Sequence, residues 1–428
     1  MVNYKYPGFF VFIILLLFSS ATAQVRTGLD VLIANKYEQL KDKKIGLICN
    51  QTSLTSKGEF SAKLFSKQKS FTLKALFSPE HGLSGQRKAG ATSDTVEMFE
   101  DKIPVYSLYG GTRKPARSML RGIDALVFDM QDIGVRPYTY LSTMIYAMEA
   151  AAEYQIEFII LDRPNPLSGE RIEGNILDSG LRSFLGVISI PYIHGMTLGE
   201  LAQMAKDRHW FIDAANLELT VIKMTGWKRS MYWNETGLKW KAPSPNVPTF
   251  ASAVGCAMFG AVGELGILSV GIGSDIPFLR LGSKLVQPEF LEKAVLSSLP
   301  KGISATREDF TVPYEDSIKT FHGMKIELPK NMAQVDKLYG PEYIILQKLA
   351  TDTVFASSFE KLKLGKKLVF EKVSGVRNFL QAFNSSMEAI ITVNGEKKSV
   401  SLVEGFLNKW QKDAEKFREM RKKYLLYE

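Results

Sequence analysis

The chain has 428 residues, of which 45% are hydrophobic and 23% are charged, and its formal net charge is +9. This length exceeds one ordinary folding unit, so the sequence predicts two domains, each with a sizeable core. The composition is that of a soluble globular protein. With only Cys49 and Cys256 present, a disulfide framework and a cysteine-based metal site are both excluded.

The first 23 residues have the pattern of an export signal. Lys5 precedes the apolar stretch 8–18 (GFFVFIILLLF), and an Ala-Thr-Ala sequence ends at Ala23, directly before Gln24. This arrangement is typical of a cleavable signal peptide, and an uncleaved membrane anchor is the alternative. We therefore expect an exported protein, periplasmic or secreted, without stable membrane insertion after signal cleavage.

A basic net charge is compatible with nucleic acid, an anionic membrane or an acidic polymer as partner. The lysines are scattered along the chain and are not clustered with aromatic residues. A solvated basic surface is therefore the simpler interpretation, and no nucleic-acid partner is expected.

Short apolar segments alternate with helix-like segments in the first part of the chain. The apolar segments are 45–49, 73–77, 105–108, 125–128 and 158–161. The helix-like segment 142–154 places its large apolar side chains on one face at helical spacing. Nearly all-apolar strands that alternate with helices predict an α/β, Rossmann-like domain with a parallel sheet covered on both faces.

The Pro-rich stretch 241–248 (KAPSPNVP) is typical of a domain boundary. The sequence thus divides into a signal peptide (1–23), a Rossmann-like first domain (24–250) and a smaller, mixed α+β second domain (251–428). In the second domain we expect strands around 324–328 and 388–393. We also expect an amphipathic helix at 402–424 that docks on its own domain.

Polar residues directly follow four of the predicted strands. In chain order they are Asn50, Glu80, His81, Asp129, Gln131, Asp132, Arg163 and Asn165. The carboxyl ends of parallel strands lie at one edge of a sheet and form its ligand-binding crevice. We therefore expect these side chains to converge in one pocket around Glu80.

Four sequence blocks carry a family resemblance: SPEHGLSG (78–85), FDMQDIGVRPYTY (128–140), DRPNPLSG (162–169) and HGMTLGELA (194–202). Together and in this order they resemble the signature blocks of the exo-acting β-N-acetylmuramidases, peptidoglycan hexosaminidases long grouped as a domain of unknown function. The resemblance covers nearly the whole mature chain, from about residue 28 to residue 427.

The resemblance implies a catalytic first domain and an auxiliary second domain that completes the cleft. The implied substrate is N-acetylmuramic acid (MurNAc) at a non-reducing end, β-1,4-linked to N-acetylglucosamine (GlcNAc), as in MurNAc-GlcNAc or muropeptides. No G-x-G-x-x-G opens the first strand–helix unit and no P-loop motif is present. The sequence therefore predicts neither a nucleotide nor another cofactor.

Hydrolysis of a glycosidic bond needs a proton donor for the leaving oxygen and a carboxylate that stabilises the cation or activates water. Glu80 is the candidate acid because it follows an apolar strand and Pro79, where burial would favour the protonated form. A helix-start carboxylate is its alternative role. Asp129 and Asp132 are the candidates for the second carboxylate, and the sequence does not decide between them. Asp132 could also be a turn residue.

Several residues are candidates for holding the sugar. Arg136 and Arg163 could each clamp the lactyl carboxylate, since a guanidinium pairs a carboxylate in a bidentate fork, or could form a structural ion pair. Tyr138 could stack on a sugar face or pack in the core. The remaining candidates are Asn50, His81, Gln131, Asn165 and His194. A metal-dependent hydrolase is a weaker alternative, because no ligand motif accompanies these histidines and aspartates.

One block departs from the family pattern. Residues 264–275 (ELGILSVGIGSD) keep Glu264 and the glycine spacing of an acidic block, but Val270 and Ile272 replace a carboxylate and an arginine. Glu264 is expected to face the substrate, and Asp275 could compensate for the missing carboxylate. The lost charged pair motivates a second hypothesis, a catalytically weakened muropeptide-binding protein.

Overall fold

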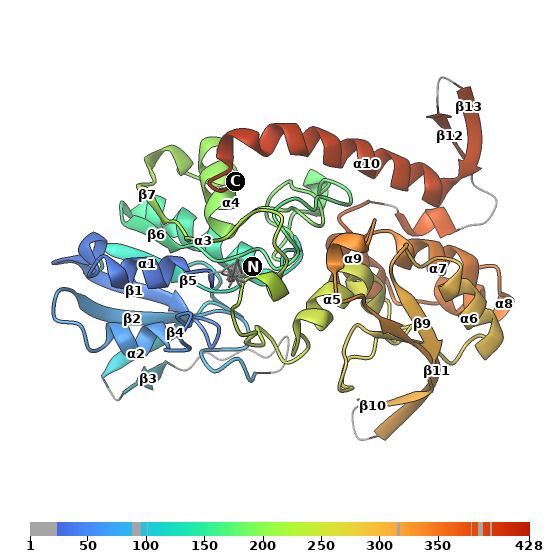
Figure 1. Cartoon of the computed structure of the whole chain (residues 1–428), viewed down its shortest axis with the longest axis horizontal. Coiled ribbons are helices and arrows are strands. Elements are labelled where there is room, and N and C mark those ends of the chain that lie inside the picture. The colour runs from blue at the N-terminus through green and yellow to red at the C-terminus, as the bar shows by residue number, and fades with distance from the viewer. Residues whose placement is uncertain are drawn as a thin grey trace, which may run out of the picture.

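The computed structural model describes residues 24–87, 96–100, 102–314, 317–377, 379–383, 388–393 and 396–428. The predicted signal peptide, 1–23, lies outside these residues. Across the described ranges, none of the helices combines the length and apolar character that a membrane crossing requires. Two domains lie side by side, and one long helix extends across both (Figure 1).

A seven-stranded sheet forms the centre of the first domain, in the order β3-β4-β2-β1-β5-β6-β7. The strands are β1 (Lys44–Cys49), β2 (Thr72–Ser78), β3 (Glu97–Phe99), β4 (Ile103–Ser107), β5 (Ala125–Asp129), β6 (Glu157–Leu161) and β7 (Leu219–Ile222). All neighbouring strands are parallel except β3, which is antiparallel to β4. The predicted α/β class is confirmed, and the two edge strands β3 and β7 are additions.

Helices cover both faces of this sheet, which explains why its central strands β1, β5 and β6 are apolar except at an end. Leu47 and Val127 pack toward α1 (Gly28–Ala34) and α2 (Ser61–Phe65). The alternate residues, such as Ile48 and Phe128, pack in a second core with α3 (Thr139–Tyr154) and α4 (Leu198–Asp207). Side chains that leave the ends of the strands therefore point toward one of two different helical layers.

The chain changes direction between β1 and β5, which are hydrogen-bonded neighbours. From β1 it continues to β2 and β4 on one side, and from β5 to β6 and β7 on the other. In such open sheets, ligands bind outside the carboxyl ends of the strands at this switch point. Asn50 and the residues after Asp129 lie there.

The second domain is mixed α+β, as predicted. Its helices are α5 (Phe250–Gly263), α6 (Pro288–Leu296), α7 (Pro341–Leu349), α8 (Thr353–Glu360) and α9 (Leu364–Ser374). Its strands are β8 (Arg280–Ser283), β9 (Ser304–Arg307), β10 (Phe310–Tyr314), β11 (Ser317–Glu327), β12 (Glu388–Val393) and β13 (Glu396–Ser401). The central helix, α5, is apolar on nearly every side because the rest of the domain packs around it.

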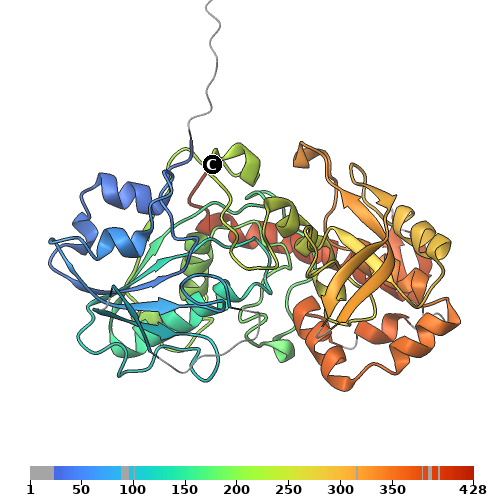
Figure 2. The same ribbon diagram turned by 90° about the horizontal axis from the view of Figure 1, so that it is seen from below.

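The long helix α10 (Leu402–Arg421) connects the two hydrophobic cores. Val403 and Trp410 pack in the core of the second domain, whereas Ala414 and Phe417 pack in the core of the first. Both views show α10 running from one domain to the other (Figures 1 and 2). The expectation that this helix docks only on its own domain was therefore wrong for its C-terminal half.

The end of the chain is fixed to the first domain. The Tyr427 hydroxyl donates to Asp162 Oδ2 at 2.6 Å, and burial raises the pKa of this aspartate to about 6. Tyr427→Phe removes one donor from a buried carboxylate, so we expect the free energy of unfolding to fall by about 1–3 kcal/mol in urea titrations. Tyr424→Phe is the matched control, because its hydroxyl partner, Asp207, is exposed. Equal losses in both variants would contradict this role of Tyr427.

A buried carboxyl group makes the stability of the second domain depend on pH. Glu342, in the first turn of α7, is 1% exposed and accepts a hydrogen bond from Val262 N at 3.0 Å. Burial raises its pKa to about 8, so the native state holds this proton more tightly than the unfolded chain does. The resulting stabilisation is complete below the pKa that Glu342 has in the unfolded chain. It is lost as the pH rises through the pKa that Glu342 has in the folded protein.

We expect Glu342→Gln to remove this dependence. The difference in unfolding free energy between wild type and variant should change by on the order of 3–5 kcal/mol between pH 4 and pH 9. Urea unfolding at several pH values measures this difference. A difference that stays constant over this range would show that Glu342 does not titrate with a raised pKa.

Candidate active site

Hydrogen bonds join the carboxyl ends of β1, β5 and β6 into one edge. The Thr52 hydroxyl donates to Asn50 Oδ1 at 2.6 Å and accepts from Gln131 N at 3.0 Å. Gln131 Nε2 in turn donates to Pro164 O at 2.8 Å. Asn50 and Gln131, both predicted to bind substrate, therefore each use one end of the amide to hold this edge together, while Asn50 Nδ2 and Gln131 Oε1 have no hydrogen-bond partner within the described ranges.

Glu80 lies beyond the end of β2 and faces the start of α3. Its Oε2 accepts a hydrogen bond from the Thr139 hydroxyl at 2.9 Å, and only 9% of its surface is exposed. Burial raises the pKa of the Tyr109 phenol, and the adjacent Glu80 carboxylate adds to this rise. Thr139 and Tyr109 were not among the predicted site residues. Thr139 lies inside a signature block, whereas no pattern in the sequence indicated Tyr109.

A tight turn follows Glu80. His81 and Gly82 both have left-handed backbone conformations, with φ of 71° and 73°, and a left-handed non-glycine residue is strained. His81 Nδ1 bonds to Arg87 O at 2.8 Å. The imidazole of His81, predicted to bind substrate, thus closes the loop that carries Glu80.

Asp132 and His194 form a buried pair. Asp132 Oδ2 accepts from Gly134 N at 2.7 Å and lies 3.6 Å from His194 Nε2. Met196 N donates to His194 Nδ1 at 3.3 Å, whereas His194 Nε2 has no hydrogen-bond partner in the described part of the chain. Asp132 Oδ1 is buried and has no hydrogen-bond partner among the described residues. It is therefore an acceptor that a ligand could use.

The Tyr140 phenol interacts electrostatically with both candidate carboxylates, Glu80 and Asp132. Burial raises the pKa of Tyr140, and the carboxylates of Glu80 and Asp132 both raise it further. The Glu80 carboxylate reaches the residue before Tyr140, because it accepts a hydrogen bond from Thr139. In the part of the chain that the structure describes, no three His, Cys, Asp or Glu side chains are arranged to hold a metal ion.

Asp129 has a different environment. It is fully buried, and its Oδ1 accepts from Arg163 Nε at 2.7 Å. Burial raises the pKa of Asp129, and the ion pair with Arg163 opposes that rise. Arg163 also donates to Leu54 O at 2.9 Å and, with Gln131, borders a cavity of about 50 Å³. This geometry indicates that Asp129 positions Arg163.

The structure argues against Arg136 as a carboxylate clamp. Its guanidinium is completely buried and donates to Asn175 O at 2.8 Å, to Ile190 O at 2.9 Å and to Ser374 O at 2.8 Å. The last of these carbonyl groups belongs to the C-terminal end of α9 in the second domain. Because its donors are committed to backbone carbonyls, Arg136 connects the two domains.

Asn165 and Tyr138 also have structural partners. Asn165 donates from Nδ2 to Met196 O at 3.0 Å and accepts from Leu167 N at 2.9 Å. Both ends of its amide are therefore occupied, which argues against the predicted contact with a sugar. Tyr138 is half-buried, and its ring meets that of Tyr140 edge-on at 4.8 Å, so aromatic packing is the interaction observed.

The divergent block 264–275 lies in the second domain. Glu264 follows α5 and is half-buried; burial raises its pKa, and Lys366 of α9 opposes that rise. Val270 is buried, whereas Ile272 is 42% exposed. The Asp275 carboxylate pairs with Arg280 and so does not stand free in place of the missing charge.

Comparisons with known proteins match the chain over almost its entire length. The N-terminal family model of the exo-beta-N-acetylmuramidase NamZ matches residues 45–251, and the C-terminal model matches residues 255–427. The peptidoglycan beta-N-acetylmuramidase NamZ of Bacillus subtilis (strain 168) is 37% identical over 408 residues, which cover 94% of this chain and 92% of the relative.

Two crystal structures of DUF1343 family proteins from Bacteroides fragilis have the same fold. One superposes with a TM-score of 0.83 at 34% identity, and the other with a TM-score of 0.67 at 25% identity. Each comparison covers 95% of this chain and 99% of the other. From the two family models and these relatives we conclude that the chain belongs to the exo-β-N-acetylmuramidase family.

Proposed function

We propose that this protein is an exo-β-N-acetylmuramidase that releases MurNAc from the non-reducing end of peptidoglycan fragments. The observation that supports the catalytic assignment is the position of the two carboxyl groups at the carboxyl edge of the sheet, where Glu80 is hydrogen-bonded to Thr139 at the start of α3 and Asp132 lies in the loop between β5 and α3. Family membership supports the reaction class. The export pattern of residues 1–23 supports a site of action outside the cytoplasm.

Glu80 is the proposed general acid. The Thr139 hydroxyl donates to Oε2 and so fixes the orientation of the carboxyl group. In this role Glu80 supplies a proton. The proton of Glu80 passes to the glycosidic oxygen as the bond to the MurNAc anomeric carbon breaks, so the GlcNAc part leaves as an alcohol.

Asp132 is the proposed second carboxylate. Gly134 N holds Oδ2 by a hydrogen bond, and the His194 imidazole lies 3.6 Å from it. Oδ1 is left to face the positive charge that develops on the sugar or the attacking water. We assign substrate binding to the buried ion pair of Asp129 and Arg163. Arg163, which borders a cavity, is the proposed partner of the lactyl carboxylate.

The test is hydrolysis of two disaccharides by the purified protein. We expect release of MurNAc from MurNAc-β-1,4-GlcNAc and no cleavage of GlcNAc-β-1,4-MurNAc, because only the first has MurNAc at its non-reducing end. Cleavage of both, or of neither, would reject exo-muramidase activity. Calorimetric binding of the first disaccharide without hydrolysis would instead support the muropeptide-binding hypothesis that Val270 and Ile272 motivated.

A further inference from the structure

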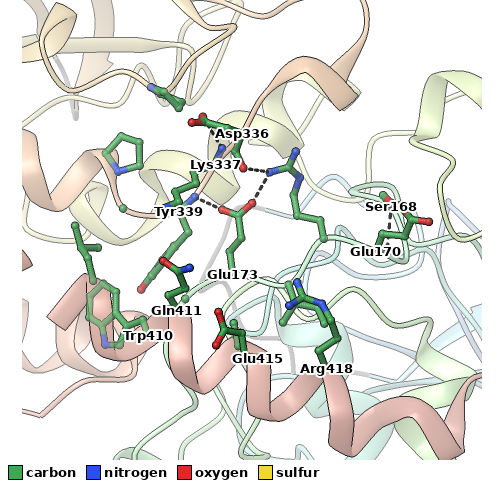
Figure 3. A pocket seen from close by; sticks show the side chains of 18 of the residues that line it. Ser168, Glu170, Glu173, Asp336, Lys337, Tyr339, Trp410, Gln411, Glu415 and Arg418 are labelled. Atoms are coloured by element: carbon green, nitrogen blue, oxygen red, sulfur yellow. Dashed lines mark hydrogen bonds and ion pairs between the residues drawn. The ribbon is translucent and has the colours of Figure 1, made fainter. Parts of the chain in front are cut away.

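A second, larger cavity of about 630 Å³ lies between the two domains and α10. Its walls come from the loop after β6, from residues 333–344 of the second domain and from α10 (Figure 3). None of the residues proposed for catalysis lines it. The volume is in the range of cavities that bind small molecules in proteins.

The loops that form this cavity are held in place by buried hydrogen bonds. Glu173 Oε2 accepts from Leu338 N at 2.7 Å and from Tyr339 N at 2.8 Å. Arg171, which forms an ion pair with Glu173, also donates to Val335 O at 2.7 Å. The first domain and the second domain are therefore joined across this wall, and the cavity is preformed.

The rim of the cavity carries both signs of charge. Lys337 and Arg418 are cationic, and Glu170 and Glu415 are anionic. Across the described ranges, none of these four side chains forms a hydrogen bond or an ion pair, whereas Arg171 and Glu173 deeper in the cavity are fully engaged. Figure 3 shows Glu415 and Arg418 on α10 and Lys337 on the opposite wall.

The remaining wall is apolar. Trp410 and Leu407 of α10 and Ile344 of α7 line it, and Trp410 is almost fully buried. A ligand that uses this surface therefore carries separated positive and negative charges together with small apolar groups. A short peptide with free carboxylates and free amines has this chemistry, whereas a neutral sugar or a polyanion leaves one set of charges unmatched.

We propose that this cavity binds a short zwitterionic peptide, and, on the basis of the proposed function, that this peptide is the stem of a muropeptide. The carboxylates of the stem would pair with Lys337 and Arg418, and the amine of its diamino acid with Glu170 or Glu415. The protein would then hold the peptide part of a fragment at a site separate from the one that cleaves the sugar.

Calorimetry with the free stem tetrapeptide L-Ala-γ-D-Glu-diaminopimelate-D-Ala tests this site. We expect the wild-type protein to bind the peptide, and Arg418→Glu to weaken binding at least tenfold. Lys416→Glu is the matched control, because Lys416 is exposed on the same helix but does not line the cavity. Acetylation of both amines of the peptide should also weaken binding at least tenfold.

Two results would overturn the proposal: no binding of the tetrapeptide to wild type, or equal weakening by Arg418→Glu and Lys416→Glu. Peptide binding and enzymatic activity are measured independently, because the activity is assayed on MurNAc-GlcNAc, which carries no peptide. Both variants should cleave the disaccharide at the wild-type rate. Loss of peptide binding with intact cleavage counts against the cavity alone, whereas a wild type that binds peptide but cleaves no disaccharide counts against the proposed activity alone.

Discussion

Replacement of Glu80 by glutamine is expected to lower kcat for MurNAc release by about 10²–10⁴-fold. Glutamine keeps the size of the side chain and can still accept the hydrogen bond from Thr139, but it has no proton to give to the glycosidic oxygen. KM for MurNAc-GlcNAc should change much less, because an interaction made only in the transition state is lost. Steady-state kinetics on the disaccharide measure both values.

One further variant and one further substrate make this result specific. Glu38→Gln is the control, since Glu38 is an exposed carboxylate of the same domain. It should leave kcat unchanged. A substrate with a good leaving group, such as a dinitrophenyl MurNAc glycoside, needs little protonation, so Glu80→Gln should lose much less activity on it. Equal losses on both substrates would show that Glu80 is not the acid.

Replacement of Arg136 by methionine is expected to lower the free energy of unfolding by on the order of 3 kcal/mol. Methionine fills much of the same space but removes the guanidinium donor from three buried carbonyl groups, those of Asn175, Ile190 and Ser374. Ile190 O and Ser374 O then keep only the longer hydrogen bonds from Leu177 N at 3.3 Å and from the Tyr339 hydroxyl at 3.5 Å. Arg182→Met, at an exposed position of the same domain, should change stability by less than about 0.5 kcal/mol. Urea unfolding compares the two variants.

The same contact can be disturbed from the second domain. Gly375 has φ of 75°, and a Cβ atom added there would lie 2.2 Å from Arg136 Nη2. Gly375→Ala should therefore displace the guanidinium and destabilise the protein as well. Because both substitutions act on one contact, the double variant should lose less stability than the two single losses together. Full additivity would show that Arg136 and Gly375 act independently.

The sheet of the first domain could be predicted because buried parallel strands are apolar throughout their length. Five of its strands were recognised in this way, and their polar ends lead to the edge of the sheet where the candidate site lies. The short edge strands β3 and β7 are partly exposed and carry no such pattern. The class of fold therefore follows from local sequence, whereas the extent of the sheet does not.

The choice between Asp129 and Asp132 could not be made from sequence. Asp129 ends β5, and by the alternation of the strand it shares the side of Val127, toward α1 and α2, where it meets Arg163. Asp132 lies beyond the strand, in a turn whose direction depends on Gly134 and His194. Arg136 was equally unpredictable, because its partner Ser374 is 238 positions away in the chain.

The continuous helix α10 limits how the two domains can move relative to one another. The polypeptide passes between the two domains once near residues 241–250 and again along α10, which is anchored by Trp410 at one side and by Phe417 at the other. Two separate tethers prevent the domains from swinging apart about a single flexible linker. Rotation of one domain relative to the other therefore has to bend α10 or displace one of its two anchors.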